Sequence, residues 1–432
     1  MSQTLLKEKK ERRQPGKSSH NGRVLKKVAY TMSRFPKLTE TFILYEMLAM
    51  EEAGIEVELF PLLRERQDVQ HREVERYLQR AHFHPFFSLP ILWANLYYLF
   101  RKPLAYLKVV WEVFSGVLGS LNFFFGALGV FPKAVRFAYE MERMGVEHLH
   151  AHFATHPVVA ALIIKRLTGI PYSFTVHGSD LHVERRMLDV KVKASAAAVT
   201  VSNFNKNVMI QECGEALGEK IHVIHCGVDT DLFQCQDRSS HGGVFRILCV
   251  ASFEEVKGHQ YLVEACKLLA QRGVDFICHL VGYGPLRQQI EKQIAAEGLQ
   301  NKFKIHGGLP RNEVLNLYRE ADVFILPSVI TKNGKKEGIP VVLMEAMCTC
   351  LPVISSRMSG IPELVQDGAA GILVEPRDAA GLADALQKLH DQPQLRAKMG
   401  KAGREYVLEQ FDLKKNARLL LTLIEKTTIQ LR

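Results

Sequence analysis

The chain has 432 residues, enough for two or three domains that each bury a core of their own. Hydrophobic residues make up 47% and charged residues 24%, which excludes a chain that is mostly disordered, fibrous or embedded in a membrane. The formal net charge is +10, but residues 1–27 hold nine Lys or Arg against two Glu, so +7 of it lies there. The remaining surface is too weakly basic to predict a nucleic-acid partner.

Residues 1–23 lack the apolar segment of a signal peptide, so they are not expected to be one. They are rich in charged residues and are predicted to be a flexible basic tail. Attraction of this tail to anionic lipid head groups is the alternative interpretation. All eight cysteines follow residue 212, and none shows the CxxC spacing; Cys348 and Cys350 are the nearest pair. We therefore expect no disulfide framework and no zinc site, and we expect the protein to be cytoplasmic. If the tail binds lipid, the protein contacts the inner face of the cytoplasmic membrane.

From residue 24 onward, short apolar runs alternate with helical segments, a pattern typical of parallel sheets with crossover helices. A helix is expected at 39–53. The first domain, 24–233, is predicted to contain strands at 24–30, 55–60, 147–152, 171–177, 196–202 and 220–225.

A polar linker at 234–243 separates this domain from a second one at 244–410. Two α/β domains that face a cleft are therefore expected, with ligand-binding loops after the strands. The second domain is predicted to contain strands at 245–250, 276–281, 302–306, 323–327, 353–355 and 372–374, with helices that begin near 258, 285, 310, 338 and 378.

An apolar insert at 86–131 interrupts this alternation, and residues 113–131 carry no charge. Helices packed against the amino-terminal domain are one interpretation. A surface that lies on a membrane, with Arg101, Lys102 and Lys108 at the head groups, is the second. A span or re-entrant hairpin is the third, which the four glycines and Asn122 of this stretch disfavour.

The segment after the strand at 323–327 is the strongest functional signal. Gly338, Ile339 and Pro340 suit a close backbone approach at the start of a helix, where free N–H groups bind a phosphate. Glu345, about two turns later, is placed to accept hydrogen bonds from ribose hydroxyls, and Glu337 is placed to hold a sugar.

Residues 337–378 resemble the signature of family 4 retaining glycosyltransferases, which have the GT-B fold of two Rossmann-like domains. The resemblance extends from about residue 24 to the carboxyl end and includes HCGVDTDLF, VKGHQYLVEA and LVGYGPLR in that order. Residues 33–47 and 150–182 are similar to the transferases that build bacterial exopolysaccharides such as colanic acid. The resemblance also implies that a helix at 411–432 packs back on the amino-terminal domain.

Carried over to this chain, the resemblance implies that Glu337 contacts the donor sugar, Glu345 the ribose and Lys257 the diphosphate. An Arg is usual about five residues before this Lys, but here Ser252 stands in its place. Lys335 and Lys336 are candidates to restore the missing positive charge, and an ordinary solvated loop is the alternative.

Other candidates follow strands of the two domains. The resemblance implies that His177 acts at the donor sugar and that Gly282 and Gly284 lie near the nucleotide. Asp229 and Asp231 resemble a metal-binding DxD motif, but their sequence context favours a turn. The candidates with weaker support are His152, Asp180 and Thr39, the last of which also suits a helix N-cap.

We therefore expect a retaining glycosyltransferase that moves a sugar from a nucleotide-sugar donor to a glycan or a lipid-linked acceptor, without a metal or another cofactor. The predicted partners are these two substrates and, as a further option, an anionic membrane. A GT-B sugar-nucleotide epimerase and a non-catalytic nucleotide-sugar-binding protein are the alternatives. A dehydrogenase is disfavoured, because no strand is followed by GxGxxG with an acidic residue about twenty positions later.

Overall fold

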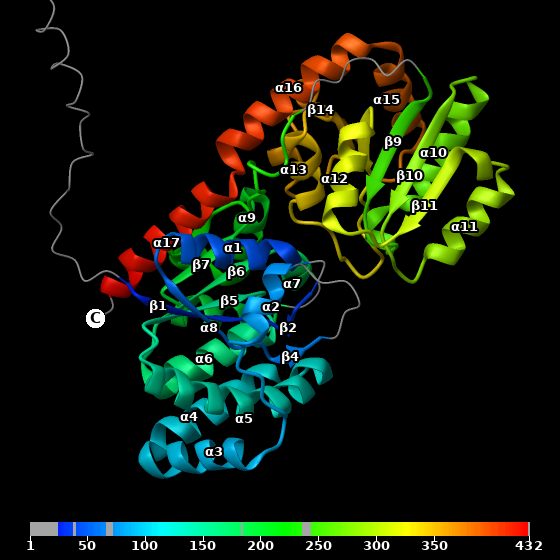
Figure 1. Ribbon diagram of the computed structural model, residues 1–432. Coiled ribbons are helices and arrows are strands. Elements are labelled where there is room, and N and C mark those ends of the chain that lie inside the picture. The colour runs from blue at the N-terminus through cyan, green and yellow to red at the C-terminus, as the bar shows by residue number, and fades with distance from the viewer. Residues whose placement is uncertain (1–24, 38–39, 66–71, 183–184, 236–242, 431–432) are drawn as a thin grey trace, which may run out of the picture.

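The computed structural model describes residues 25–37, 40–65, 72–182, 185–235 and 243–430. The predicted basic tail and Thr39 lie outside these residues. Two six-stranded parallel sheets, each covered by helices, form the two halves of the molecule (Figure 1). Because both faces of such sheets are buried, most of their strands are continuous apolar runs.

The amino-terminal sheet has the strand order β3-β1-β5-β6-β7-β8, and β2 pairs with β4 in a separate small sheet. The order reverses between β1 and β5, which is where a doubly wound sheet leaves a crevice at its carboxyl edge. The elements are β1 (Lys27–Thr31), β2 (Arg34–Phe35), α1 (Thr41–Glu52), β3 (Glu56–Leu59), β4 (Leu63–Arg64), α2 (Arg72–Leu78), α3 (Leu89–Arg101), α4 (Pro103–Val117), α5 (Leu121–Met144), β5 (His148–His152), α6 (His156–Thr168), β6 (Tyr172–Val176), α7 (Ser179–His182), α8 (Leu188–Ala194), β7 (Ala197–Thr200), α9 (Asn203–Cys213), η2 (Glu215–Lys220) and β8 (Ile221–Val223).

The carboxyl-terminal sheet has the order β11-β10-β9-β12-β13-β14, which is the Rossmann order with its reversal between β9 and β12. Its elements are β9 (Phe245–Val250), η3 (Glu255–Lys257), α10 (His259–Gln271), β10 (Phe276–Val281), α11 (Arg287–Ala296), η4 (Gln300–Lys302), β11 (Phe303–Gly307), α12 (Arg311–Glu320), β12 (Val323–Leu326), α13 (Val341–Cys348), β13 (Val353–Ser356), α14 (Ile361–Leu364), β14 (Gly371–Val374), α15 (Ala379–Asp391), α16 (Pro393–Gln410) and α17 (Leu413–Gln430).

The last helix crosses from one domain to the other. α16 packs on α13, whereas α17 packs on α1 and β7 of the amino-terminal domain (Figure 1). Leu420 and Ile424 of α17 are buried in one core cluster with residues of β1, α1 and β3. The chain therefore completes the amino-terminal core with its final segment.

A second contact joins the domains through a carboxylate. Glu363 of α14 accepts hydrogen bonds from the backbone N–H groups of Asn203 and Phe204, each at 2.8 Å. These amides open α9, so a side chain from one domain caps a helix of the other.

The apolar insert forms α3, α4 and the first part of α5, at the end of the amino-terminal domain that faces away from the other domain (Figure 1). One face of these helices, including Tyr98, Val113 and Phe123, is buried in the core against α6. The opposite face exposes large apolar side chains. Among the described helices, none combines the length and the apolar character that crossing a bilayer requires.

The expectation of no disulfide framework is wrong for one cysteine pair. Cys235 and Cys350 are bonded, with their Cα atoms 5.1 Å apart. The segment after Phe233 lies against the end of α13, where the Cys348 thiol donates to the Phe233 carbonyl at 3.0 Å. This long-range packing, which the residue spacing does not reveal, brings the two cysteines together.

We expect the packing of α17 to dominate the stability of the amino-terminal domain. Ile424→Ala should lower the free energy of unfolding by about 2–5 kcal/mol, because Ile424 has no exposed surface and its loss leaves a cavity. Ile429 lies on the same helix but is 55% exposed, so Ile429→Ala should change the free energy of unfolding by no more than about 0.5 kcal/mol. Urea unfolding followed by circular dichroism measures both, and equal losses would contradict the packing described.

Candidate functional site

A cavity of about 490 Å³ lies between the two domains, a volume typical of small-molecule sites. Its walls come from residues that follow β6 on one side and, on the other, from the carboxyl ends of β9 and β10, the residues after β11 and the loop that joins β12 to α13, which is where ligands bind to doubly wound sheets. Eleven of the predicted site residues line it: His177, Ser252, Lys257, Gly282, Lys335, Lys336, Glu337, Gly338, Ile339, Pro340 and Glu345.

The loop after β12 leads into α13 through Glu337, Gly338 and Pro340. Pro340 is the N-cap residue, so α13 begins at Val341, three residues after the start near 338 that the sequence predicted. A Cβ atom on Gly338 would lie 2.0 Å from the carbonyl oxygen of His177. The glycine is thus required by the approach of the opposite domain, and the N–H groups of the first turn of α13 border the cavity.

Lys257 ends the short helix η3, directly after β9 and its following loop. Its Nζ atom lies 2.8 Å from Glu337 Oε1, and the two side chains are 19% and 17% exposed. Partial burial reduces the screening of this ion pair by water. A cation and a carboxylate are therefore held next to the start of α13.

Glu345 faces the cavity from the second turn of α13. Its Oε2 atom accepts a hydrogen bond from the Tyr318 hydroxyl at 2.9 Å. Burial raises the pKa of Glu345 to about 7, although Tyr318 and the positive charge of Arg311 oppose this shift. Near neutral pH, the carboxyl group can therefore gain or lose a proton when a ligand binds.

Arg311, which was not among the predicted site residues, opens α12 and lines the cavity. Its guanidinium lies 4.2 Å from the centre of the Tyr45 ring and donates to the Tyr45 hydroxyl at 2.5 Å. Tyr45 belongs to α1, so this contact bridges the cleft. A basic residue in the first turn of a helix that follows a strand was a usable signal.

Ser252 stands where an arginine is usual in the family, so other charged side chains surround this position. The Ser252 hydroxyl donates to Glu254 at 3.4 Å, and Lys335 Nζ pairs with the same carboxylate at 2.6 Å. Lys336 Nζ lies 4.8 Å from the centre of the Phe204 ring. Five basic and four acidic side chains line the cavity, so a slight excess of positive charge remains without the arginine.

His177 follows β6 and is packed between the rings of Phe42 and Phe153, with centroids 4.6 and 4.9 Å away. Asp180 does not line the cavity. Its carboxylate accepts hydrogen bonds from the N–H groups of Gly178 at 2.8 Å and His177 at 3.1 Å, so it shapes the turn that carries His177.

Two further candidates lie behind the cavity wall. His152 has no exposed surface, and its Nδ1 atom lies 3.0 Å from His177 Nε2. Gly284 has a packing role, because a Cβ atom there would lie 2.7 Å from the backbone nitrogen of Phe253.

The Asp229 to Asp231 segment forms the turn that its sequence context favours. The Asp229 carboxylate accepts hydrogen bonds from the N–H groups of Asp231 and Leu232, at 3.2 and 3.1 Å. Asp231 pairs with Lys414 of α17 at 3.1 Å. Neither carboxylate lines the cavity.

Parts of this chain are similar in sequence to two bacterial glycosyltransferases. The chain is 42% identical over 171 residues to the amylovoran biosynthesis glycosyltransferase AmsK of Erwinia amylovora, a match that covers 40% of this chain and 42% of AmsK. It is 37% identical over 209 residues to the putative colanic acid biosynthesis glycosyltransferase WcaL of Salmonella typhimurium, covering 48% of this chain and 51% of that protein. The chain thus spans about half the length of these relatives.

Solved structures share the fold over nearly all of the chain. A glycosyltransferase from Rickettsia africae superposes with a TM-score of 0.69 at 19% identity, covering 93% of this chain and 98% of that one. Anabaena HepE in complex with UDP superposes with a TM-score of 0.68 at 16% identity, covering 92% and 98%. These likenesses establish the GT-B architecture.

Two family models match consecutive parts of the sequence. The model described as Glycosyltransferase Family 4 matches residues 112–232, and the model described as Glycosyl transferases group 1 matches residues 236–406. Together they cover more than half of the chain. The resemblance seen in the sequence is confirmed, and the chain belongs to the glycosyltransferases of the GT-B fold, with a family 4 and a group 1 domain in succession.

Proposed function

We propose that this protein transfers a sugar from a nucleotide-sugar donor to a glycan or a lipid-linked acceptor, with retention of configuration, in the biosynthesis of a cell-surface polysaccharide at the inner face of the cytoplasmic membrane. One observation carries the proposal: Lys257, Glu337 and Glu345 meet in a single cavity at the start of α13, opposite His177. The printed functions of AmsK and WcaL support the choice of a polysaccharide pathway.

Each group has a distinct role in this proposal. The N–H groups that open α13 and the Lys257 ammonium bind the diphosphate and stabilise it as it leaves. Glu345 accepts hydrogen bonds from the ribose hydroxyls, and Glu337 from the donor sugar. Because Lys257 already pairs with Glu337, the carboxylate that meets the sugar is held close to the phosphate-binding cation.

The reaction needs no protein nucleophile in this scheme. The bond between the sugar and the diphosphate breaks while the acceptor hydroxyl attacks the same face, and the leaving phosphate takes the proton of that hydroxyl. Positive charge builds up on the sugar ring, and the Glu337 carboxylate lies where it can stabilise this charge.

An epimerase and a non-catalytic binding protein predict different products from the same cavity. An epimerase releases free nucleotide or an altered sugar without any acceptor, whereas a binding protein shows no slow hydrolysis of the donor. UDP-, GDP- and ADP-sugars should therefore be screened for hydrolysis and for a thermal shift. Slow hydrolysis to the unaltered sugar, with a raised melting temperature, is expected of a transferase.

The two glutamates should respond differently to the same substitution. Glu345→Gln removes a charged acceptor, so it should weaken binding of the matching nucleoside diphosphate by about 1–3 kcal/mol. Glu337→Gln should mainly lower kcat, because its partner is the sugar. Calorimetry with the free diphosphate separates the roles. If only Glu337→Gln loses binding of the diphosphate, the roles of the two glutamates are the reverse of those proposed. If neither substitution has an effect, the site lies elsewhere.

The pH dependence of nucleotide binding provides a second test of Glu345. Its pKa lies at about 7, above the ordinary value, so the acceptor form is depleted below that pH and fully present above it. Affinity for the nucleoside diphosphate should therefore rise as pH rises through about 7. The Glu345→Gln variant is the control, because this part of the pH dependence should vanish in it.

We also propose that transfer requires no metal ion. The Asp229 to Asp231 turn lies away from the cavity, and Lys257 with the start of α13 supplies positive charge for the diphosphate. Transfer measured in excess EDTA should equal the rate without it. A loss that manganese restores would overturn this part of the proposal.

The exposed face of the apolar insert is proposed to bind an anionic membrane. Single exposed apolar side chains are ordinary, but a cluster of this extent marks a binding surface. Exposed basic residues on the same helices, Arg101 and Lys108, match the charge of such a membrane. The face comprises Phe87, Leu89, Leu92, Trp93, Leu96, Phe100, Leu104, Leu107, Trp111, Leu118, Leu121, Phe125 and Leu128.

Replacing two aromatic residues of this face should weaken membrane binding. The double variant Phe100→Ala with Trp111→Ala should bind vesicles that contain phosphatidylglycerol at least tenfold more weakly, because each buried aromatic side chain contributes about 1.5–3 kcal/mol. Leu419→Ala with Ile429→Ala, two exposed residues of α17, is the matched control. Unchanged vesicle binding, or a dimer that the aromatic variant abolishes, would contradict a membrane role.

A further inference from the structure

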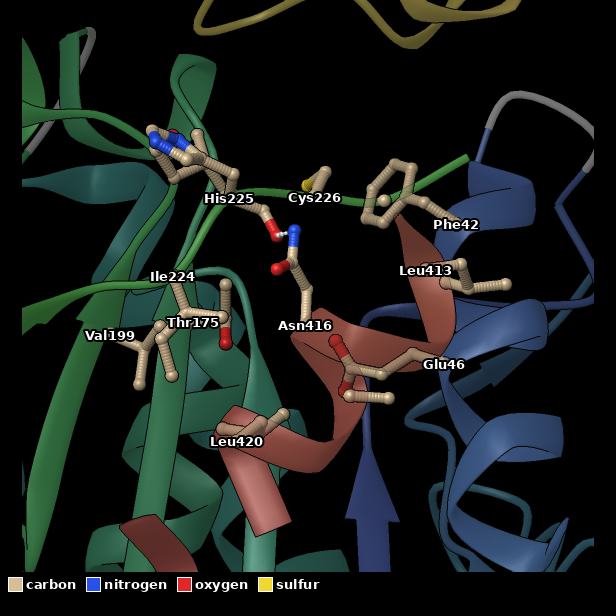
Figure 2. Close-up of a pocket in the computed structure, with 13 residues that line it drawn as sticks. Phe42, Glu46, Thr175, Val199, Ile224, His225, Cys226, Leu413, Asn416 and Leu420 are labelled. Carbon is tan, nitrogen blue, oxygen red and sulfur yellow. Dashed lines mark hydrogen bonds between the residues drawn. The ribbon is translucent and has the colours of Figure 1, made fainter. Parts of the chain in front are cut away.

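A row of polar side chains lies behind His177, inside the amino-terminal domain. Glu46 comes from α1, His152 ends β5, and His177 follows β6. Glu46, Thr175 of β6, Asn416 of α17 and Cys226 also line a small void of about 20 Å³. Figure 2 shows how these side chains lie around it. The scheme proposed above uses only His177 of this row.

The row is continuous at atomic distances. The Tyr30 hydroxyl donates to Glu46 Oε1 at 3.0 Å, and His152 Nε2 lies 3.2 Å from the same oxygen. His152 Nδ1 lies 3.0 Å from His177 Nε2. At the far end, the Cys226 sulfur lies 3.7 Å from His177 Nδ1, and both residues line the cavity.

The two ends of the row fix the direction of its hydrogen bonds. Burial raises the pKa of Glu46, but His152, His150 and the Tyr30 hydroxyl outweigh it and lower the pKa overall, so Glu46 is ionised and only accepts. Burial raises the pKa of the Cys226 thiol, so its S–H group is present as a weak donor.

His177 lies between these two ends. Burial and the neighbouring His152 and His150 lower the pKa of His177 well below its usual range, so its ring is neutral and carries a single proton. If the Cys226 thiol donates to Nδ1, this proton is on Nε2. His152 Nδ1 then accepts it, and the remaining proton of His152 is on Nε2, facing Glu46. The 3.2 Å contact with Glu46 is not aligned as a hydrogen bond, and among the described residues no group accepts an aligned hydrogen bond from that nitrogen.

We infer that Glu46 and His152 are positioning residues that hold His177 in the tautomer with its proton on Nε2 and its lone pair on Nδ1, at the cavity. When the donor sugar binds, one of its hydroxyls displaces the weak S–H donor of Cys226 and donates to this lone pair. The inference rests on the proposed function for this last step only. The tautomer itself is inferred from the row of contacts with the Cys226 thiol as the donor to Nδ1.

The ring is also fixed sterically. Phe153, which follows His152, has a left-handed backbone with φ of 70°, and its ring packs against that of His177 at a tilt of 50°. Such a backbone is strained for a non-glycine residue and persists only where the surroundings enforce it. Its N–H group donates to the Thr175 carbonyl at 2.9 Å, which ties β5 to β6 beside the row.

The test is a direct measurement of the protonation sites. Imidazole nitrogens that carry a proton have pyrrole-type ¹⁵N shifts, and those that do not have pyridine-type shifts. In the wild-type protein at neutral pH, His177 should show a pyrrole-type Nε2 and a pyridine-type Nδ1, and His152 should show the same pattern. His177→Gln and His152→Gln variants provide the assignments.

Glu46→Gln tests whether the carboxylate sets this pattern. An amide can donate to His152 Nε2 as well as accept from it, so both tautomers of His177 should become populated. Glu58→Gln is the matched control, because Glu58 Oε2 also lies 3.0 Å from a histidine nitrogen, that of His82, but outside the cavity lining. It should leave the shifts of His152 and His177 unchanged.

The kinetic consequence is measured separately from the tautomer. With a donor that the protein turns over, Glu46→Gln should lower kcat by roughly ten- to a hundredfold, a loss typical of a misplaced catalytic group, while binding of the free nucleoside diphosphate stays within about twofold. A loss of diphosphate binding in step with kcat would indicate a structural role and overturn the inference.

Other results would overturn the inference directly. One is a protonated Nδ1 of His177, or a doubly protonated His152, in the wild-type protein. Another is a stoichiometric divalent cation bound by Glu46, His150 and His152, whose ligand atoms lie within 4.8 Å of one another. If the protein transfers no sugar at all, the proposed function fails while the wild-type NMR spectrum still decides the tautomer.

Discussion

No side chain larger than a hydrogen atom fits between Gly338 and the end of β6, and this constraint sets the distance between the two domains. The same close approach places the start of α13 opposite His177. Glu363 fixes a second point by capping α9 across the interface. Two contacts to one domain limit both the separation and the rotation of the other, so the cavity between them has a defined width.

The charges of the cavity are largely paired with one another. Lys257 pairs with Glu337 and Lys335 with Glu254, while Arg311 reaches across to Tyr45. A polyanionic ligand must therefore replace the carboxylate groups that already pair with the basic side chains of the cavity. Such a site favours an anion whose shape can make these exchanges over a simple inorganic ion.

The sequence predicted the features that local patterns carry. The strands of both sheets and the helix starts after them follow from alternating apolar runs, and Glu337 and Glu345 follow from a motif within one loop and helix. Contacts between distant segments were not predictable in this way. The Cys235–Cys350 bond, the bridge from Arg311 and the row that joins Glu46 to His177 each depend on how separate elements pack.

The position of α17 has a consequence for how the chain is made. During synthesis, the amino-terminal domain emerges about two hundred residues before the helix that closes its core. Domains whose segments are contiguous can fold as they leave the ribosome. Here the surface formed by α1 and β7 stays uncovered until α17 has been synthesised, so the two domains must complete their folding together, and a chain truncated before α17 would expose this apolar surface to chaperones and proteases.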